Sequence, residues 1–181
     1  WGVRRIILIL LLAFALRAIS LDDVPPGWRD DEVIETTVHA QLVIDGERPL
    51  YFIQAEGHEP LYHYISAIWI VLVGDSLFSV RLVSAFFGLL AVAAAHRLTR
   101  QMFGTRFALF VALLLAVSFW ALMYSRVKIR HISELPFALM AFFLLLKTSR
   151  VYLTSNLPPN FGRPISILAG ITIALAIYTY L

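Results

Sequence analysis

Apolar runs long enough to cross a bilayer recur along this chain, and they constrain its fold more than any other feature. A spanning helix needs roughly 20 mostly apolar residues, with about 17 as the short limit. In lipid the backbone must satisfy its own hydrogen bonds, and runs of this length do so as helices. The mean hydropathy of +0.79 and the 15% content of charged residues lie outside the range of soluble domains. The sequence therefore predicts an all-α fold, a polytopic transmembrane helical bundle.

Five segments are predicted to span: residues 3–20, 79–96, 107–125, 132–146 and 164–181. The fourth is short, but it can cross with little tilt. Two other segments, 31–45 and 61–73, are predicted as interfacial helices of the first outer loop, because the second is too short to span and carries polar rings after Pro60. Nothing divides residues 1–181 into two domains. The chain starts without Met and ends in an apolar run, so we expect a fragment, the N-terminal transmembrane portion of something longer.

Charge is distributed asymmetrically between the loops. With these spans, Arg4 and Arg5, the loop 97–106 and the segment 147–163 lie on one side with two, three and three Lys or Arg residues, and all twelve Asp and Glu lie on the other. The positive-inside rule then places the N-terminus inside, on the cytoplasmic side of the membrane. Acids count for little in that rule, so the outer, extracytoplasmic side is predicted to be the active face. A net charge of +3 is too small to indicate nucleic acid as a partner.

The first outer loop begins with three acids, Asp30, Asp31 and Glu32, which head a segment of helical periodicity. Asp30 or Asp31 is expected as the N-cap and Gly46 as the C-terminal stop. A helix N-terminus favours the ionised carboxylate, which suits a base or a cation ligand. The alternative is that these acids only cap a surface helix, which is the commoner use of such residues.

A second polar stretch, 57–69, carries His58, Glu59 and His63. Histidine and carboxylate are ordinary metal ligands, so a divalent metal is one interpretation. The two histidines are five residues apart, however, rather than the four of a helical pair, which weighs against it. The chain has no cysteine. We therefore expect no metal and no other cofactor.

The third polar stretch, 124–137, holds four potential cations and one acid: Arg126, Lys128, Arg130, His131 and Glu134. Three fixed cations at mid-bilayer would cost roughly 9 kcal/mol, so this loop must reach water or lipid headgroups. Arginine matches phosphate well, which predicts a bound anionic group. The alternative is that the cations extend to the phosphates of membrane lipid.

In order along the chain, the acid pair Asp31–Glu32, the stretches GHEPLYHYISA, SLFSVRLVSAFFGLLAVAAAHRLTRQMFG and YSRVKIRHISELPF, and the final YTYL resemble membrane glycosyltransferases of the C fold type. The sequence is most similar to the bacterial group related to protein O-mannosyltransferases and aminoarabinose lipid A transferases. Two positions depart from that pattern. Glu59-Pro60-Leu61 stands where Pro-Pro-Leu is frequent, and His131, with Glu134 after it, stands where many members have a second Asp.

The resemblance implies transfer of a sugar from a polyprenyl-phosphate donor to an extracytoplasmic acceptor, with Asp31 as the base and Glu32 beside it. The predicted substrate-binding residues are His58, Glu59, Arg126, Lys128, Arg130, His131 and Glu134. Two alternatives stay open: a transporter or channel subunit, which would need ionisable residues near the midplane, and a non-catalytic lipid-binding protein. The donor sugar, the prenyl chain and the acceptor are not specified by these residues.

Overall fold

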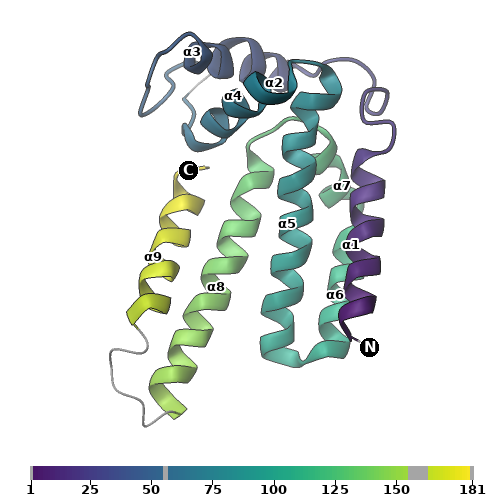
Figure 1. Cartoon of the computed structure of the whole chain (residues 1–181), viewed down its shortest axis with the longest axis vertical. Coiled ribbons are helices and arrows are strands. Elements are labelled where there is room, and N and C mark those ends of the chain that lie inside the picture. Colours follow the sequence, from purple (N-terminus) through teal and green to yellow (C-terminus); the bar gives the residue numbers. More distant parts are fainter. Residues whose placement is uncertain (1, 55–56, 155–162, 180–181) are drawn as a thin grey trace.

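The regular elements of the structure, a computed structural model that describes residues 2–54, 57–154 and 163–179, are all helices (Figure 1). Long helices run side by side as a bundle: α1 (Gly2–Ala18), α5 (Leu77–Phe103), α6 (Thr105–Val117), α8 (His131–Thr154) and α9 (Arg163–Ile177). Small side chains, among them Ala13, Ala112 and Ala116, let α1, α5 and α6 approach closely. The predicted all-helical class is confirmed.

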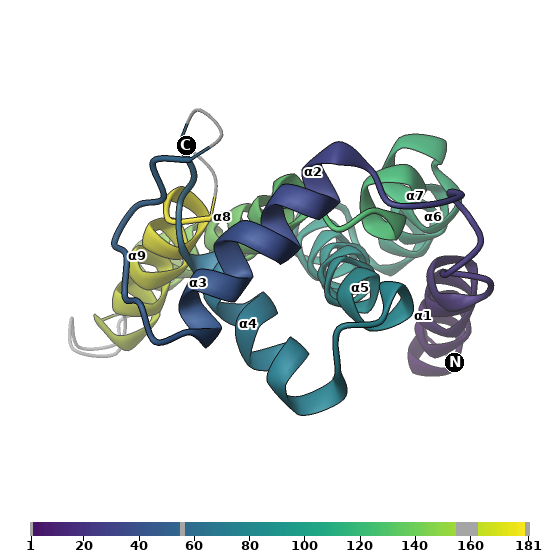
Figure 2. The same cartoon turned by 90° about the horizontal axis from the view of Figure 1, so that it is seen from above.

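A layer of short helices lies across one end of this bundle (Figure 2). The helix α2 (Asp30–Val33), the π-helix η1 (Ile34–Ala40) and α3 (Gln41–Ile44) follow one another without a break, and α4 (Leu61–Val73) packs beside them. We call these four elements the cap. Tyr62 of α4 joins the cap to the bundle, because its ring packs on Phe87 and its hydroxyl hydrogen-bonds Ser84 Oγ at 2.7 Å. The helices predicted for residues 31–45 and 61–73 are thus present and cross the end of the bundle.

The first cap helix starts differently from the prediction. Arg29, not Asp30 or Asp31, is the N-cap residue, with extended backbone (φ −93°, ψ 155°), and its N–H donates to Glu32 Oε2 at 2.9 Å. All three acids therefore lie inside the first turn. The stop at Gly46 is confirmed: its φ of 101° lets the N–H of Glu47 reach the carbonyl of Leu42 at 3.0 Å.

Among the described residues, two helices are long and apolar enough to cross a membrane alone, Leu77–Phe103 and His131–Ser149. The span at 107–125 stays a prediction: its residues form two helices, α6 and α7 (Phe119–Arg126), which meet at a break and are bent by 56°. The predicted loop 97–106 is mostly the end of α5, which turns at Gly104 (φ 84°), and α8 extends into the predicted segment 147–163. Crossing by α1 and α9 stays a prediction. Pro158, Pro159 and residues 180–181 lie outside the described residues.

Arg17 of α1 fills the break between α6 and α7. Its side chain is fully buried and donates to the carbonyls of Ala116 at 3.1 Å and Leu115 at 3.4 Å, and to Ser125 Oγ at 3.2 Å. The last carbonyls of α6 have no partners within their own helix, and a buried guanidinium needs acceptors. The break and the buried arginine thus satisfy each other.

The close packing at this break predicts an asymmetry between two helical glycines. A Cβ on Gly88 would lie 2.9 Å from Arg17 Nε and closer still to Ser125 Oγ, whereas one on Gly170 would have no neighbour within 4 Å. Gly88→Ala should lower the free energy of unfolding by about 1–3 kcal/mol through overpacking. Gly170→Ala should be neutral, or stabilising by up to about 1 kcal/mol. Thermal unfolding in detergent measures both, and equal Tm values would contradict the packing described here.

Candidate active site

Asp31 is exposed in the first turn of α2, on the outer surface of the cap. Its carboxylate forms no hydrogen bond or ion pair with any residue that the structure describes. Asp30 beside it is exposed as well. Asp31 therefore offers an accessible carboxylate in a first helical turn.

Glu32, one residue on, points the opposite way and is fully buried. Arg81 of α5 binds it with two hydrogen bonds, from Nε to Oε1 at 2.7 Å and from Nη2 to Oε2 at 2.8 Å. The backbone N–H groups of Arg29 and Lys128 each donate to the same carboxylate at 2.9 Å. Burial alone would raise the pKa of Glu32, but these donors, Arg81 first, hold it below the usual value.

The remaining donors of Arg81 bind the loop that leads into the cap. Its Nη atoms donate to the carbonyls of Leu21 at 2.9 Å, Pro25 at 2.8 Å and Gly27 at 2.6 Å. One fully buried guanidinium thus fixes both the loop before α2 and the first turn of α2 to α5. Arg81 determines where Asp31 stands without touching it.

A second tie joins the cap to the loop before α8. Lys128, fully buried, donates from Nζ to the carbonyl of Glu35 at 2.7 Å, and the N–H of Arg130 donates to Glu35 Oε1 at 3.2 Å. Burial raises the pKa of Glu35 to about 8, although the charge of Lys128 acts to lower it. Burial also lowers the pKa of Lys128 to about 8. Glu35 was not among the predicted site residues. Its position three residues after Glu32, on the same helix face, was the available signal.

Arg126, predicted to bind substrate, closes the end of α1 instead. Its three guanidinium nitrogens donate to the carbonyls of Leu16, Ile19, Ser20 and Val24 at 2.6 to 3.1 Å. These are the carbonyls that a helix end and the turn after it leave without partners. The donors of Arg126, like those of Lys128, are thus directed at the chain itself.

The other predicted residues of this stretch gather near Asp31. Arg130 Nε lies 3.8 Å from Glu59 Oε2, and its Nη1 donates to the carbonyl of Gly57 at 3.4 Å. His131 is exposed at the start of α8, and Asp31, Glu59 and Glu134 all lie near enough to act on its imidazole electrostatically. The structure therefore brings Asp31, two other carboxylates and Arg130 together around the His131 imidazole.

His58 belongs to a different group. Its ring packs against His39 (centroids 4.6 Å apart) and His63 (5.5 Å), and ligand atoms of these three histidines lie within 4.8 Å of one another. The sequence prediction considered His58, Glu59 and His63; Glu59 faces Arg130 instead, and His39 was missed. The spacing argument against a metal assumed a single helix, whereas His58 precedes α4.

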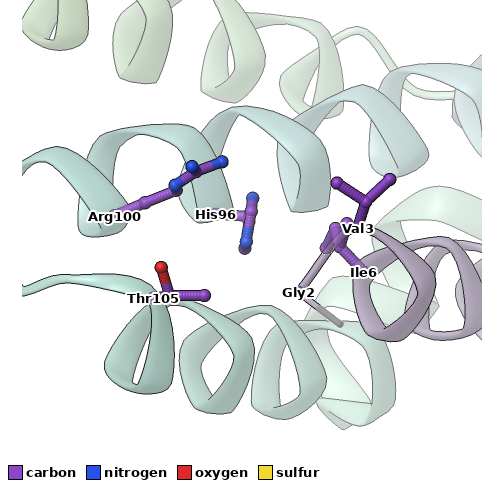
Figure 3. A pocket seen from close by; sticks show the side chains of 6 residues that line it. All are labelled: Gly2, Val3, Ile6, His96, Arg100 and Thr105. Atoms are coloured by element: carbon purple, nitrogen blue, oxygen red, sulfur yellow. The ribbon is translucent and has the colours of Figure 1, made fainter.

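A pocket of about 270 Å³ lies at the other end of the bundle, near the N-terminus (Figure 3). Its lining residues are Gly2, Val3, Ile6, His96, Arg100 and Thr105. None of them is a carboxylate. With no carboxylate in its wall, this pocket does not offer the combination of acids and cations found near Asp31.

The Arg81–Glu32 pair gives a test of what positions the site. Arg81→Met should lower the free energy of unfolding by about 3–5 kcal/mol, because it leaves Glu32 buried without its countercharge. Adding Glu32→Gln to that variant should recover part of the loss, so that the two changes are strongly non-additive. Arg48→Met, at an exposed arginine in the loop after α3, is the control and should cost little. Unfolding in detergent measures Arg81→Met, Glu32→Gln, the double variant and Arg48→Met, and additive effects would refute the coupling.

The fold of this chain is also found in a known protein. No curated protein matches the chain in sequence. Among solved structures, the Archaeoglobus fulgidus oligosaccharyltransferase, tethered with an acceptor peptide containing the NVT sequon, matches with a TM-score of 0.80 and 18% identity over 99% of this chain. The likeness covers 24% of that larger protein, and at this identity it shows the fold alone. The chain thus has the fold of part of a membrane glycosyltransferase of the C type.

A family model gives the more specific result. The model of the dolichyl-phosphate-mannose-protein mannosyltransferases matches residues 57–181, from the loop that carries His58 and Glu59 to the end of the chain. The match includes α4, α5, Arg81 and the whole stretch from Arg126 to Glu134, and Asp31 lies before it. Since the matched residues are well over half of the chain, this integral membrane protein belongs to the dolichyl-phosphate-mannose-protein mannosyltransferase family.

Proposed function

We propose that this chain carries the base and part of the donor site of a membrane glycosyltransferase, which moves a sugar from a polyprenyl-phosphate donor to an extracytoplasmic acceptor. The observation that carries the proposal is Asp31: an accessible carboxylate at a helix N-terminus, held in place through Glu32 and Arg81, with Arg130 and His131 nearby. The family name supports a lipid-phosphate sugar donor. An oligosaccharyltransferase with the same fold, tethered to an acceptor peptide, supports an acceptor outside the chain.

The chemistry needs one base and a place for a leaving phosphate. Asp31 takes the proton from the acceptor nucleophile, which attacks the anomeric carbon as its bond to the phosphate oxygen breaks. The bonding electrons leave with the polyprenyl phosphate, and the configuration at the anomeric carbon inverts. Cations near the leaving oxygen lower the barrier by stabilising its growing charge. A phosphate is a good leaving group, so no strong general acid is required.

The residues divide between two roles. Arg130 and His131 are assigned to the donor phosphate, while Glu59 and Glu134 accept hydrogen bonds from hydroxyl groups. Glu32, Lys128 and Arg126 act as positioning residues, because their polar atoms bind the chain itself. The predicted role of Glu32 beside the base thus becomes an indirect one.

The outer surface of the cap suits a reaction at the membrane boundary. Ile68, Val71 and Leu72 of α4 are 61 to 74% exposed, an apolar face for membrane lipid. Arg4, Arg5 and Arg100 lie toward the other end of the bundle, with the N-terminus (Figure 1). The positive-inside rule then favours a cytoplasmic N-terminus and an extracytoplasmic cap in a bacterial inner membrane. A lipid-borne donor and a water-borne acceptor can meet only at such a surface.

The base assignment predicts a large loss of rate without loss of structure. Asp31→Asn in the full-length enzyme should lower kcat by roughly a hundredfold or more, because a positioned base is removed, and leave donor affinity and Tm nearly unchanged. Asp30→Asn is the matched control, an exposed acid one residue away, and should retain most of the activity. Sugar transfer from a radiolabelled prenyl-phosphate donor gives the rate. Full activity in Asp31→Asn would exclude the residue as the base and revive a non-catalytic or transport role.

The phosphate assignment separates two arginines of the same stretch. Arg130→Ala should weaken binding of the prenyl-phosphate donor by about 1.5–3 kcal/mol, or roughly 10- to 150-fold in Kd, through loss of a charge-assisted contact. Arg126→Ala should instead lower Tm and leave the donor affinity of the folded protein unchanged, because its donors close the end of α1. Donor titration and thermal unfolding on each variant measure the two effects. The opposite pattern would exchange the roles of the two residues.

A further inference from the structure

Three histidines from three separate segments meet beneath the surface of the cap. His39 comes from η1, His58 from the loop before α4, and His63 from the first turn of α4. The ring centroid of His39 lies 4.6 Å from that of His58 and 4.5 Å from that of His63. One potential ligand nitrogen from each ring lies within 4.8 Å of the other two. His39 and His63 are fully buried.

The local structure aims each ring at the same point. The π-helix turns His39 inward, together with Glu35. Phe52 and His58 exchange two backbone hydrogen bonds, of 2.9 and 2.8 Å, which fix His58 on its loop, and the Phe52 ring packs on His39 and His63. π-helical segments are rare in proteins and frequently lie at functional sites. The π-helix, the backbone pairing of Phe52 with His58 and the Phe52 ring thus hold the three histidines together.

Neither ring nitrogen of His39 or His63 has a hydrogen-bond partner of ordinary geometry among the described residues. A buried imidazole without partners costs free energy, so native proteins rarely contain two side by side. The backbone carbonyl of Gln54 acts electrostatically on the His39 ring, although the two do not form a hydrogen bond of ordinary geometry. A ligand histidine commonly directs its second nitrogen at a carbonyl in this way.

Two cations, Lys128 and Arg130, act on the rings of His39 and His63 and oppose a dication here. Arg130 Nε lies 3.8 Å from Glu59 Oε2, and Glu35 acts electrostatically on Lys128. The cluster thus lies among charges of both signs.

We propose that His39, His58 and His63 form a divalent-metal site of the zinc class, which joins η1, the loop of His58 and α4. Three imidazoles without a thiolate suit Zn²⁺. Metal–nitrogen bonds of about 2.0–2.1 Å put tetrahedral ligand atoms about 3.4 Å apart, so small side-chain rotations close the site. The metal supplies the tie between the two halves of the cap, and it holds the helix of Asp31 against α4. This inference does not depend on the proposed transferase activity.

The first measurement uses the wild-type, full-length protein without a polyhistidine tag, purified with zinc and then dialysed. We expect about one zinc per chain, with three imidazole ligands in its X-ray absorption spectrum. Chelation should lower Tm, and Zn²⁺ should restore it. Protein that takes up no zinc, or zinc bound without imidazole, would overturn the proposal even if every histidine variant failed to fold.

The second measurement locates the ligands. His39→Ala and His63→Ala should each weaken zinc affinity at least a hundredfold and abolish the effect of chelator on Tm. His96→Ala is the matched control, a buried histidine in the pocket of Figure 3 at the other end of the bundle, and should keep the metal. Zinc retained by both cluster variants, or lost equally in His96→Ala, would refute the assignment.

Discussion

The buried pair of Arg81 and Glu32 is the interaction on which the outer half of the molecule depends. Removing two charges from water is expensive, and their attraction offsets that cost only when every remaining donor and acceptor is used. Here all of them are: Arg81 binds three loop carbonyls, and Glu32 accepts two backbone N–H groups besides the guanidinium. The pair therefore specifies one conformation for the loop after α1, for the start of α2 and for the approach of residue 128.

The neighbouring acids Asp31 and Glu32 point in opposite directions because of helix geometry alone. Consecutive residues on a helix are about 100° apart, so Glu32 can point into the core while Asp31 faces the solvent. The inward carboxylate takes the countercharge of Arg81, which leaves the outward one without a partner among the described residues. The proposed role of Asp31 as a base needs that combination of a fixed backbone and an unpaired oxygen.

The sequence predicted what local pattern determines. Hydropathy located α5 and α8, the short apolar run at 61–73 gave α4, and Gly46 marked the end of α3. The break at Ser118 was missed because its cause is Arg17, which lies about a hundred residues earlier and reaches Ser125 only in the folded bundle. Local pattern likewise gave no hint of the π-helix or of His39 beside His58.

The same limit applied to the candidate site. Arg126, Lys128 and Arg130 look equivalent as sequence, three basic residues at alternate positions. Their roles separate because α1 ends beside the first and Glu35 lies beside the second, contacts that no local pattern encodes. The position of Asp31 in a first helical turn was predictable because acids are favoured there, while its role as a base stays a proposal.

A cap of short helices would be unstable alone, because nucleating a helix costs more than its first turns return. Contacts with the rest of the molecule stabilise it: Arg81 binds Glu32 at the start of α2, Lys128 binds Glu35, and Tyr62 binds Ser84 of the bundle. The histidine cluster lies between the two halves of the cap. Each tie ends on the chain's own polar groups. Asp31, which remains at the surface, forms no such contact with the described residues. That division leaves the surface electrostatics available to a phosphate and a nucleophile.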